Sequence, residues 1–409
     1  MTTQTPTHVI VLFGGESAEH DVSCVTAAHV LRALDPQKYR ISAIGITREG
    51  KWNLATQAMA DLKRGPEHVG PKLSTEGDPT SISVVVGEAR DGARTVVFPL
   101  LHGPLGEDGT IQGLLELANI AFVGTGVLGS AVSMDKGVAK QVLHANSIPQ
   151  PNYVSLRESH VNDASLKHAI ETLGLPLFVK PANMGSSVGV SKAKSAEELK
   201  AAAAAALQYD EWIVIEEAIS GREIEVAVLG TDVARASVPG EIIPGNEFYD
   251  YEDKYITDGA KLLVPADLTA DEIEAVQKLA IVIFHTLRAE GMARVDFFYE
   301  KNGRGFLCNE INTIPGFTPI SMYPKLWQAS GLSYGELLDE LIDLAIERHS
   351  RRRRNTARYF SPNHGPLARS ASTIFRSSSS ATSTLNANFF ASRAPSTSPM
   401  HARLRALAS

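Results

Sequence analysis

The chain opens with an apolar run, HVIVLF at 8–13, in which polar and apolar positions do not alternate. Such a run is typical of a strand that is buried on both faces, and the glycine pair after it predicts a turn. GESAEHDVSCVTAAHVLRAL then combines polar residues with an apolar repeat at helical spacing. TVVFPLLHG at 95–103 and EDGTIQGLLELANI after it repeat the strand and the helix. This order predicts a doubly wound parallel sheet, which binds ligands at the carboxyl ends of its strands.

Two further regions have a different pattern. From about residue 129, a helix (SMDKGVAKQVLHAN), two strands (LPLFVKP and SVGVSKA), an alanine-rich helix and the strand WIVIEEAI predict a small α+β lobe over 129–220. From 221, a strand (REIEVAVLG), a helix that begins near Thr269, a hairpin over 293–313 and a last helix predict a second α+β lobe that ends at 349. Between this strand and this helix lies a polar segment at 244–268, whose length predicts a lid or a binding loop.

The last sixty residues differ in composition from the rest of the chain. From Arg351 onward there are ten arginines and no acidic residue, so the net charge of −7 leaves −17 for the first 350 residues. Serine, threonine and arginine in this proportion give few ways to build a core, so we expect 350–409 to be disordered. A basic tail could bind nucleic acid or membrane, but this one has no lysine and no interleaved aromatic residues to support such binding.

Composition limits the class of protein. At 409 residues with 44% hydrophobic content, the chain predicts a globular protein of two or three domains. Its apolar runs are far shorter than the roughly 20 residues that cross a bilayer, and its first residues do not resemble a secretory signal. The expected location is therefore the cytoplasm. Cys24 and Cys308 have no CxxC partner and are expected to be buried thiols.

The stretch FVKPANMGSSVG at 178–189 is a candidate phosphate site. A P-loop has its lysine after the glycines, whereas here Lys180 comes first, at the end of a predicted strand. The backbone N–H groups and hydroxyls from Gly185 to Gly189 would surround a phosphate beside that ammonium. An ordinary polar turn is the alternative for this stretch taken alone.

The hairpin ARVDFFYEKNGRGFLCNEINT is a candidate metal site. Residues two apart in a strand share a face, so Arg294 lies with Asp296, and Glu310 lies with Asn312. Two carboxylates and an amide oxygen on one face suit magnesium bound together with phosphates. Asp296 faces Glu310 only if the loop has an odd number of residues or a bulge corrects the register. A surface hairpin with ordinary charges is the alternative.

Several strings together resemble a known family. VKP…GSSVGV, IEE…GREIEV, RVD and NEINTIPGFT, in this order, resemble the ATP-grasp fold, and GGESAEHDVS, HGPLGEDGTIQG and FYDYEDKY resemble the D-alanine–D-alanine ligase family. The resemblance covers about residues 9 to 348. It implies an α/β chain with a Rossmann-like substrate domain over 1–128 and two α+β lobes, 129–220 and 221–349, that sandwich ATP.

The resemblance also implies an activity. Two D-alanines are joined through an acyl phosphate and a tetrahedral intermediate, ATP gives ADP and phosphate, and the dipeptide serves peptidoglycan synthesis. Two Mg²⁺ ions, which Mn²⁺ can replace, and a homodimer are implied as well, with no nucleic-acid or membrane partner. The rivals are a ligase that takes D-lactate second, another ATP-grasp carboxylate–amine ligase, and a nucleotide-binding module without chemistry.

Carried over residue by residue, the resemblance assigns roles to particular positions. The catalytic set is Glu19, Ser186, Tyr255 and Arg294. The substrate-binding set is Ser23, His102, Gly316 and Ser321. The ATP-binding set is Lys136, Lys180, Ser187, Glu216, Glu217, Ile219, Glu223 and Lys254, and the metal ligands are Asp296, Glu310 and Asn312. Three of these positions have an alternative reading, because Glu19 also suits a helix start, His102 also suits a structural role, and Lys254 also suits a plain surface lysine.

Overall fold

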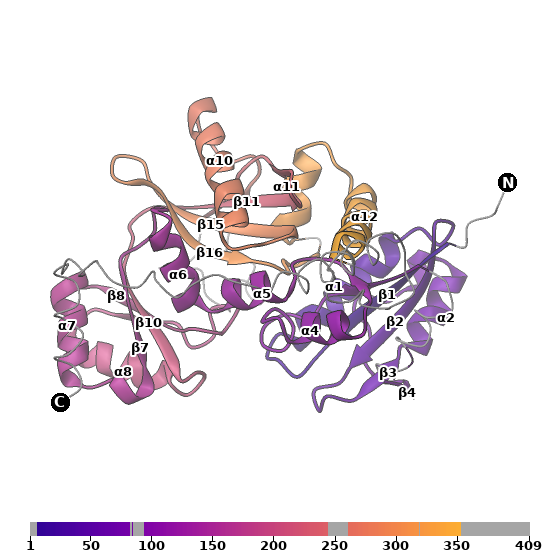
Figure 1. Ribbon diagram of the computed structural model, residues 1–409, viewed down its shortest axis with the longest axis horizontal. Coiled ribbons are helices and arrows are strands. Elements are labelled where there is room, and N and C mark those ends of the chain that lie inside the picture. Colours follow the sequence, from indigo (N-terminus) through magenta and orange to yellow (C-terminus); the bar gives the residue numbers. More distant parts are fainter. Residues whose placement is uncertain (1–5, 82–83, 85–93, 244–260, 319, 353–409) are drawn as a thin grey trace, which may run out of the picture. The chain divides into compact units, whose positions relative to one another are not determined.

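The computed structural model of the protein describes residues 6–81, 84, 94–243, 261–318 and 320–352 (Figure 1). These residues belong to one compact unit that ends at Arg352. Lys254 and Tyr255, predicted to lie on a lid loop, are outside the described residues, and so is the chain from 353 onward. Among the helices of the described residues, none has both the length and the apolar character needed to cross a membrane.

The first sheet has six strands in the order β4-β3-β2-β1-β5-β6. The strands are β1 (Thr7–Gly14), β2 (Tyr39–Ile46), β3 (Trp52–Leu54), β4 (Asp78–Pro79), β5 (Thr95–Pro99) and β6 (Ala121–Phe122). Its helices are α1 (His20–Ala33), α2 (Thr56–Arg64) and α4 (Thr110–Leu117), with a 3-10 turn at Pro66–His68. The pairs β1–β2, β1–β5 and β5–β6 are parallel, whereas β3 and β4 add an antiparallel edge.

The central strand β1 is buried on both faces. Val9 and Phe13 pack into the cluster that contains residues of α1, whereas Ile10 and Leu12 pack into the cluster that contains residues of α4. An alternating strand would leave one face polar, so the continuous apolar run at 8–13 is explained by helices on both sides of the sheet.

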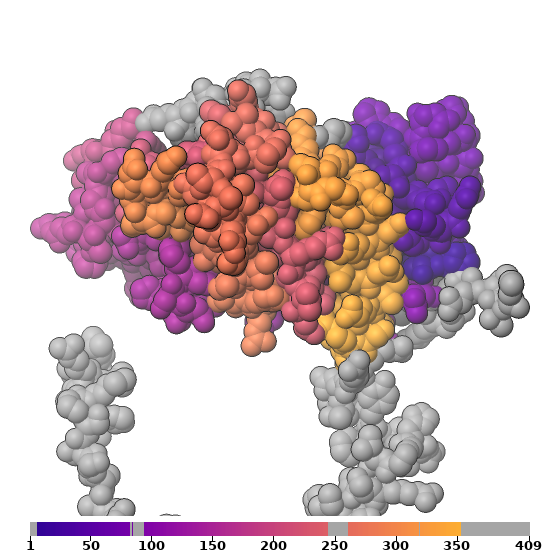
Figure 2. Space-filling model, turned by 90° about the horizontal axis from the view of Figure 1, so that it is seen from above, coloured from indigo at the N-terminus to yellow at the C-terminus, as the bar shows by residue number. Residues whose placement is uncertain are grey.

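The last helix, α12 (Tyr334–Arg352), also packs on this first sheet. Asp339 on α12 accepts hydrogen bonds from Lys38 Nζ at 2.7 Å and from the Tyr39 hydroxyl at 2.8 Å. Figure 2 shows the yellow residues of α12 beside the indigo residues of the N-terminal region. The end of the described chain therefore helps to cover the core of its beginning. The helix continues to Arg352, three residues beyond the predicted boundary at 349.

The second sheet is antiparallel, in the order β7-β10-β8-β9. It consists of β7 (Tyr153–Arg157), β8 (Leu177–Pro181), β9 (Ser191–Ala193) and β10 (Trp212–Glu217), and its helices are α7 (Asp163–Leu173) and α8 (Ala196–Ala206). The two helices α5 (Val127–Met134) and α6 (Lys136–Ala145) lead into it, and a 3-10 turn at Glu158–His160 follows β7. Apolar residues of β8 and β10 pack against α7 and α8, which lie beside this sheet (Figure 1). The other face of the sheet is left for polar side chains such as Lys180 and Glu216.

The third sheet is antiparallel as well, in the order β14-β13-β11-β15-β16, with β12 paired to β11. Its strands are β11 (Arg222–Gly230), β12 (Ala234–Ala236), β13 (Gly240–Ile243), β14 (Lys261–Leu263), β15 (Gly291–Glu300) and β16 (Gly305–Asn312), and the region also has α10 (Ala270–Thr286) and α11 (Met322–Ala329). Helix α10 begins with a capping box between Thr269 and Glu272. It packs on the face that carries Ile224, Val226 and Val295, so the alternate residues of β11 and β15 face away from it.

Candidate active site

One cavity of about 690 Å³ lies between the polar faces of the second and third sheets. Lys180 on β8 and Glu216 on β10 line it from the second sheet, and Glu223, Arg294 and Asp296 line it from the third. The cavity forms because the apolar face of each sheet packs against its own helices, whereas the polar faces of the two sheets face each other. Most of the residues expected to bind ATP or metal thus come together here.

Lys180 is held by acceptors on both sheets. Its Nζ lies 2.9 Å from Oε2 of Glu216 and 3.2 Å from Oδ1 of Asn309. Burial by itself lowers the pKa of Lys180, but the carboxylates of Glu216 and Glu310 raise this pKa above its usual value. The ammonium therefore stays charged at the point where the strand enters the glycine-rich loop, which is what binding of a phosphate requires.

The glycine-rich loop has an unusual backbone. Ser186 and Ser187 have φ angles of 49° and 60°, in the left-handed region that non-glycine residues rarely enter. Such residues cost about 1–3 kcal/mol each and persist where surrounding contacts hold them. One of these contacts comes from Lys136, at the start of α6, whose Nζ donates to the Met184 carbonyl at 2.6 Å. The loop is therefore anchored beside the cavity, with Lys136 and Lys180 in contact with the same site.

Glu19 provides a second contact for this loop. The hydroxyl of Ser186 donates to Oε1 of Glu19, which precedes α1 at the end of β1. A Cβ on Gly185 would lie 2.7 Å from Oε2 of the same carboxylate, so only glycine allows this approach. The side chain of Glu19 forms no capping hydrogen bond with α1. Two of the three residues expected to form a triad are thus joined, and the third, Tyr255, lies outside the described residues.

Ser23 and His102 lie close to Glu19, and both are buried. The Ser23 hydroxyl donates to the Leu100 carbonyl at 2.6 Å and accepts from the Gly14 amide at 2.8 Å, so it joins β1 to the end of β5. His102 Nδ1 lies 3.1 Å from the Ile314 carbonyl and 3.6 Å from Oε1 of Glu107.

Burial and nearby carboxylates act in opposite directions on the pKa of His102. Burial by itself lowers the pKa of His102, but the carboxylates of Glu107 and Glu19 raise this pKa above its usual value. The contact of the imidazole with the Ile314 carbonyl connects the first domain to the loop that follows β16.

Arg294 and Asp296 form a bidentate ion pair on β15. The guanidinium Nε and NH2 atoms donate to the two carboxylate oxygens at 2.7 and 2.6 Å. Nε also lies 3.0 Å from Oε2 of Glu225, which faces Asp296 directly across β11 and β15. Burial by itself lowers the pKa of Arg294, but these two carboxylates raise it well above its usual value. The side chain is thus a permanent cation fixed at the cavity wall.

A β-bulge brings Asp296 opposite Glu310. The hairpin loop after Glu300 has four residues, an even number, which alone would put these two residues out of register. The register shifts between Asp296 and Phe297, so Asp296 pairs with Glu310 while Phe297 pairs with Cys308. Asn309 is the extra residue, and its amide oxygen accepts from Lys180. The predicted convergence of the hairpin side chains therefore occurs through a bulge.

The oxygen ligands fit a divalent cation. Asn312 donates through Nδ2 to Oδ2 of Asp296 at 2.9 Å, and Lys136 Nζ lies 3.9 Å from Oε2 of Glu310. The cations beside these carboxylates are Arg294 at Asp296 and Lys136 at Glu310, so both carboxylates attract positive charge. Across the described parts of the chain, no three His, Cys, Asp or Glu side chains gather as a metal site, so an ion held by Asp296 and Glu310 would need further oxygen ligands from an Asn side chain or from phosphate.

The segment that joins the second sheet to the third also lines the cavity. Glu217, Ile219 and Glu223 line it there, in the segment that joins β10 to β11. The Glu217 carboxylate accepts from the backbone N–H of Asn152 at 2.6 Å and from Arg304 NH1 at 2.6 Å. Its side chain thus ties the end of β10 to the tip of the β15–β16 hairpin.

Gly316 and Ser321 lie together after β16. A Cβ on Gly316 would lie 2.7 Å from the Ser321 hydroxyl oxygen. That oxygen accepts from the Thr318 amide at 3.0 Å and lies 2.8 Å from the Thr318 hydroxyl. The turn therefore packs tightly at the end of the strand that carries Glu310 and Asn312.

Sequence reasoning missed some residues of this site, among them Glu225 and Asn309. Glu225 pairs with Arg294, and its position two residues after Glu223 on the same strand was an available signal. Asn309 contacts Lys180 because of the bulge, and nothing in the sequence located that bulge.

Comparison with known proteins gives a consistent result. Family models described as "D-ala D-ala ligase N-terminus" and "D-ala D-ala ligase C-terminus" match residues 8–125 and 142–343. The chain is 47% identical over 350 residues to D-alanine--D-alanine ligase A of Chromobacterium violaceum, covering 83% of this chain and 94% of that protein. It is 45% identical over 355 residues to D-alanine--D-alanine ligase of Heliobacterium modesticaldum, covering 85% and 96%.

Solved structures are similar in fold. The D-alanine-D-alanine ligase from Coxiella burnetii matches with a TM-score of 0.70 and 37% identity, over 86% of this chain and 99% of that one. The VanG D-Ala:D-Ser ligase from Enterococcus faecalis matches with a TM-score of 0.72 and 36% identity, over 83% and 100%. The predicted α/β ATP-grasp fold is confirmed, and the chain belongs to the D-alanine–D-alanine ligase family.

Proposed function

We propose that this protein joins two D-alanines into D-alanyl-D-alanine, with ATP converted to ADP and phosphate, for the synthesis of peptidoglycan precursors. The observation that carries the proposal is the convergence on one cavity of Lys180, the bidentate Arg294–Asp296 pair and Glu310, beside a loop that Ser186 joins to Glu19. This arrangement supports a phosphate grip, a site for a divalent cation and a place for an amino acid next to one another.

The first step activates a carboxylate. An oxygen of the first D-alanine carboxylate attacks the γ-phosphorus, the bond to the β-phosphate oxygen breaks, and ADP leaves. Lys180 and Lys136 hold the phosphates, with the hydroxyl and backbone amide of Ser187 beside them. In such phosphoryl transfer, positioning and charge stabilisation supply most of the catalysis.

The second step forms the peptide bond. The neutral amine of the second D-alanine attacks the carbonyl carbon of the acyl phosphate and gives a tetrahedral species. When that species collapses, phosphate leaves with the electrons of the C–O bond, and the nitrogen loses a proton. Arg294, with the backbone near Gly316, would stabilise the oxyanion. Ser321 would receive the carboxylate of the second substrate.

A metal would be held beside the phosphates. Asp296, Glu310 and Asn312 would hold two Mg²⁺ ions, with Mn²⁺ as a substitute. Bound there, the ions would neutralise charge on the transferred phosphoryl group. The opposed positions of Asp296 and Glu310 on β15 and β16, with their neighbouring cations, support this assignment.

The remaining residues define the subsites. Glu19 would bind the ammonium of the first D-alanine, with Ser23 and His102 in the wall around it. The backbone and side chains of Glu216, Glu217 and Ile219 would surround adenine, and Glu223 would hold the ribose. Lys254 and Tyr255 keep their predicted roles, at the γ-phosphate and in the triad with Glu19 and Ser186.

We also propose a cytoplasmic homodimer that associates mainly through the N-terminal domain. Leu117 on α4 is 90% exposed, and Leu128 on the neighbouring α5 is 59% exposed. Contiguous exposed apolar residues mark interaction sites on protein surfaces, and two exposed leucines on adjacent helices support such a site here. Sedimentation analysis of the protein and of its Leu117→Ser variant would test this arrangement, since a monomeric wild-type protein would exclude it.

The function is tested by ADP release from the purified protein with Mg²⁺. The amino-acid arms are D-alanine, L-alanine, D-alanine with D-lactate, and D-alanine with D-serine, and the products are identified by mass. D-Alanyl-D-alanine from D-alanine alone supports the proposal. A preferred D-alanyl-D-lactate or D-alanyl-D-serine product would reassign the second substrate, and ADP release without any dipeptide would leave another ATP-grasp ligase.

A further inference from the structure

Lys140 is a buried lysine that none of the assigned roles uses. It lies on α6, one helical turn after Lys136, and its side chain is 3% exposed. Its ammonium lies 3.3 Å from Oε1 of Glu216 on β10 and 5.5 Å from the ring centre of Tyr153 on β7. A lysine is almost never buried unless it is paired, so this ammonium must have a reason to be there.

The partner of Lys140 is shared with the phosphate site. Glu216 is itself 3% exposed at its side chain, and its two oxygens divide between the lysines, Oε1 toward Lys140 and Oε2 toward Lys180 at 2.9 Å. Although burial by itself raises the pKa of Glu216, the two ammonium groups lower this pKa below its usual value. The cluster therefore consists of two cations and one anion, with a net charge of +1.

The charge balance matters because of where each group lies. Lys180 and Glu216 both line the cavity, whereas Lys140 reaches Glu216 from α6. With Lys180 and Glu216 alone, the net charge offered to an anion would be zero, and a buried carboxylate would compete with phosphate for the lysine. Lys140 cancels the charge of Glu216, so the charge of Lys180 remains available to the cavity.

We infer that Lys140 is a positioning residue, a fixed counter-ion that neutralises Glu216 so that Lys180 can present a full positive charge to the phosphates of ATP. The inference depends on the proposed function for the identity of the ligand. Lys140 itself touches no substrate, and its effect passes through Glu216. A purely structural role, in which the ion pair ties α6 to β10, is the alternative that the experiment must separate.

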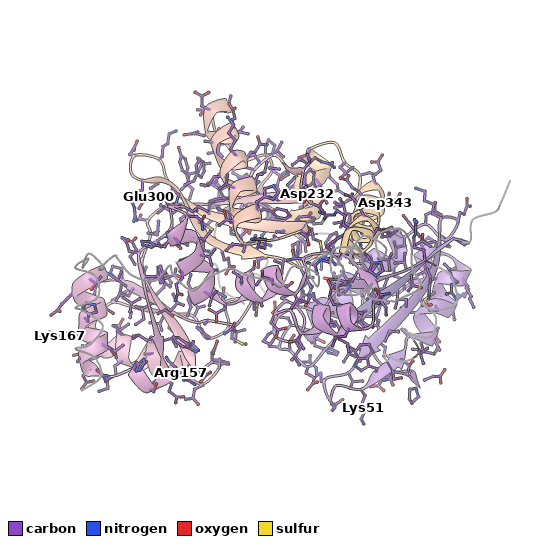
Figure 3. All side chains as sticks on the ribbon, viewed as in Figure 1. Lys51, Arg157, Lys167, Asp232, Glu300 and Asp343 are labelled. Carbon is purple, nitrogen blue, oxygen red and sulfur yellow. The ribbon has the colours of Figure 1, made fainter. Side chains whose placement is uncertain are left out.

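The test uses charge restoration. Lys140→Met keeps the unbranched side chain apart from its terminal atom but leaves the Lys180–Glu216 pair with no net charge. Lys140→Met combined with Glu216→Gln removes both opposing charges and returns the cluster to +1. Lys167→Met is the matched control, because Lys167 has 76% exposure and pairs with Glu171 on the surface of α7 (Figure 3). Thermal unfolding of each variant reports on folding.

Two readouts are compared for each folded variant. One is the Kd of a non-hydrolysable ATP analogue with Mg²⁺, measured calorimetrically without D-alanine, and the other is the steady-state KM for ATP and for D-alanine. We expect Lys140→Met to raise the Kd and the KM for ATP at least about ten-fold, with the KM for D-alanine within about three-fold of wild type. The double variant should bind the analogue at least about three-fold more tightly than Lys140→Met, because the charge of Lys180 is restored although Glu216 itself is changed at the proposed adenine subsite, and Lys167→Met should leave the Kd unchanged.

Several outcomes would overturn the inference. They are a folded Lys140→Met variant with wild-type affinity for the analogue, a folded double variant that binds no better than the single one, and failure of both variants to fold. If Lys140→Met alone does not fold, the double variant decides. A wild-type protein that does not bind the analogue would reject the proposed function itself, whereas binding without dipeptide formation would leave the counter-ion inference standing.

Discussion

His8, at the start of β1, should make the stability of this protein depend on pH in the acid range. The side chain has no exposed surface. Nδ1 lies 2.8 Å from an amino group of Arg40, and Nε2 lies 2.9 Å from the Ser42 hydroxyl. Because a guanidinium can only donate, Nδ1 accepts and the proton of the neutral ring is on Nε2. Burial of the imidazole, followed by the charge of Arg40, lowers the pKa of His8 from 6.5 to about 4.

The sign and size of the effect follow from proton binding. Below pH 6.5 the unfolded chain binds a proton at His8 that the folded chain binds only near pH 4. The stability supplied by the neutral ring is therefore complete at pH 8 and is lost as the pH falls from 6.5 toward 4. With a folded pKa of about 4, the free energy of unfolding at pH 5 is lower than at pH 8 by ~2 kcal/mol from this group alone.

The perturbation is His8→Asn, since the asparagine oxygen can accept from Arg40 but does not titrate. Urea unfolding followed by circular dichroism at pH 8, 7, 6 and 5 gives the free energy of unfolding of both proteins, and their difference cancels the other ionisable groups. We expect the advantage of wild type over the variant to shrink by ~2 kcal/mol between pH 8 and pH 5. His168→Asn, at an exposed position on α7, is the control and should show no such trend. A difference that stays constant to within ~0.5 kcal/mol would refute the reasoning.

Three further predictions concern the site and the end of the chain. Ser186→Ala removes the hydroxyl that donates to Glu19, so kcat should fall by about 10- to 100-fold at an unchanged unfolding temperature; a wild-type kcat would contradict the role of this link. Asp296→Asn removes one carboxylate charge from the proposed metal site, so the Mg²⁺ concentration for half-maximal rate should rise by about 10-fold or more, and a Mg²⁺ titration like that of wild type would argue against it. A chain that ends at 349 loses the ion pairs of Arg351 and Arg352 with surface and half-buried acids. Differential scanning calorimetry should therefore show an unfolding temperature about 2–4 °C below that of a chain ending at 352. Equal unfolding temperatures would show that these pairs contribute nothing.

Lys180 and Ser186 show which features a single stretch of sequence predicts and which contacts only the folded chain creates. The order of lysine, glycine and serine after an apolar strand was readable in one segment, and it indicated a phosphate grip other than a P-loop. The contact of Ser186 with Glu19 joins residues 167 positions apart in the chain, so only the family resemblance could suggest it. The folded chain brings the two together because the glycine-rich loop and the end of β1 reach the same region.

The hairpin gives a second example. Strand periodicity placed Arg294 with Asp296, and Glu310 with Asn312, on shared faces. Periodicity left the register open, and a bulge at Asn309 decided it. The same bulge brought the Asn309 amide oxygen to Lys180, a contact that no sequence pattern indicated. A bulge depends on cross-strand packing and hydrogen bonds, so it is a property of the assembled sheet.

By itself, the sequence determined the local elements of this protein: a buried central strand, two α+β regions, a lysine before a glycine-rich loop and carboxylates at strand spacing. These features follow from periodicity and turn chemistry, which act over a few neighbouring residues. The tertiary structure alone decided the packing of α12 on the first sheet, the pairing of Glu225 with Arg294, and the two lysines that share Glu216. Each of these requires elements that are distant in sequence to meet in a buried place, where an unpaired charge is too costly to remain.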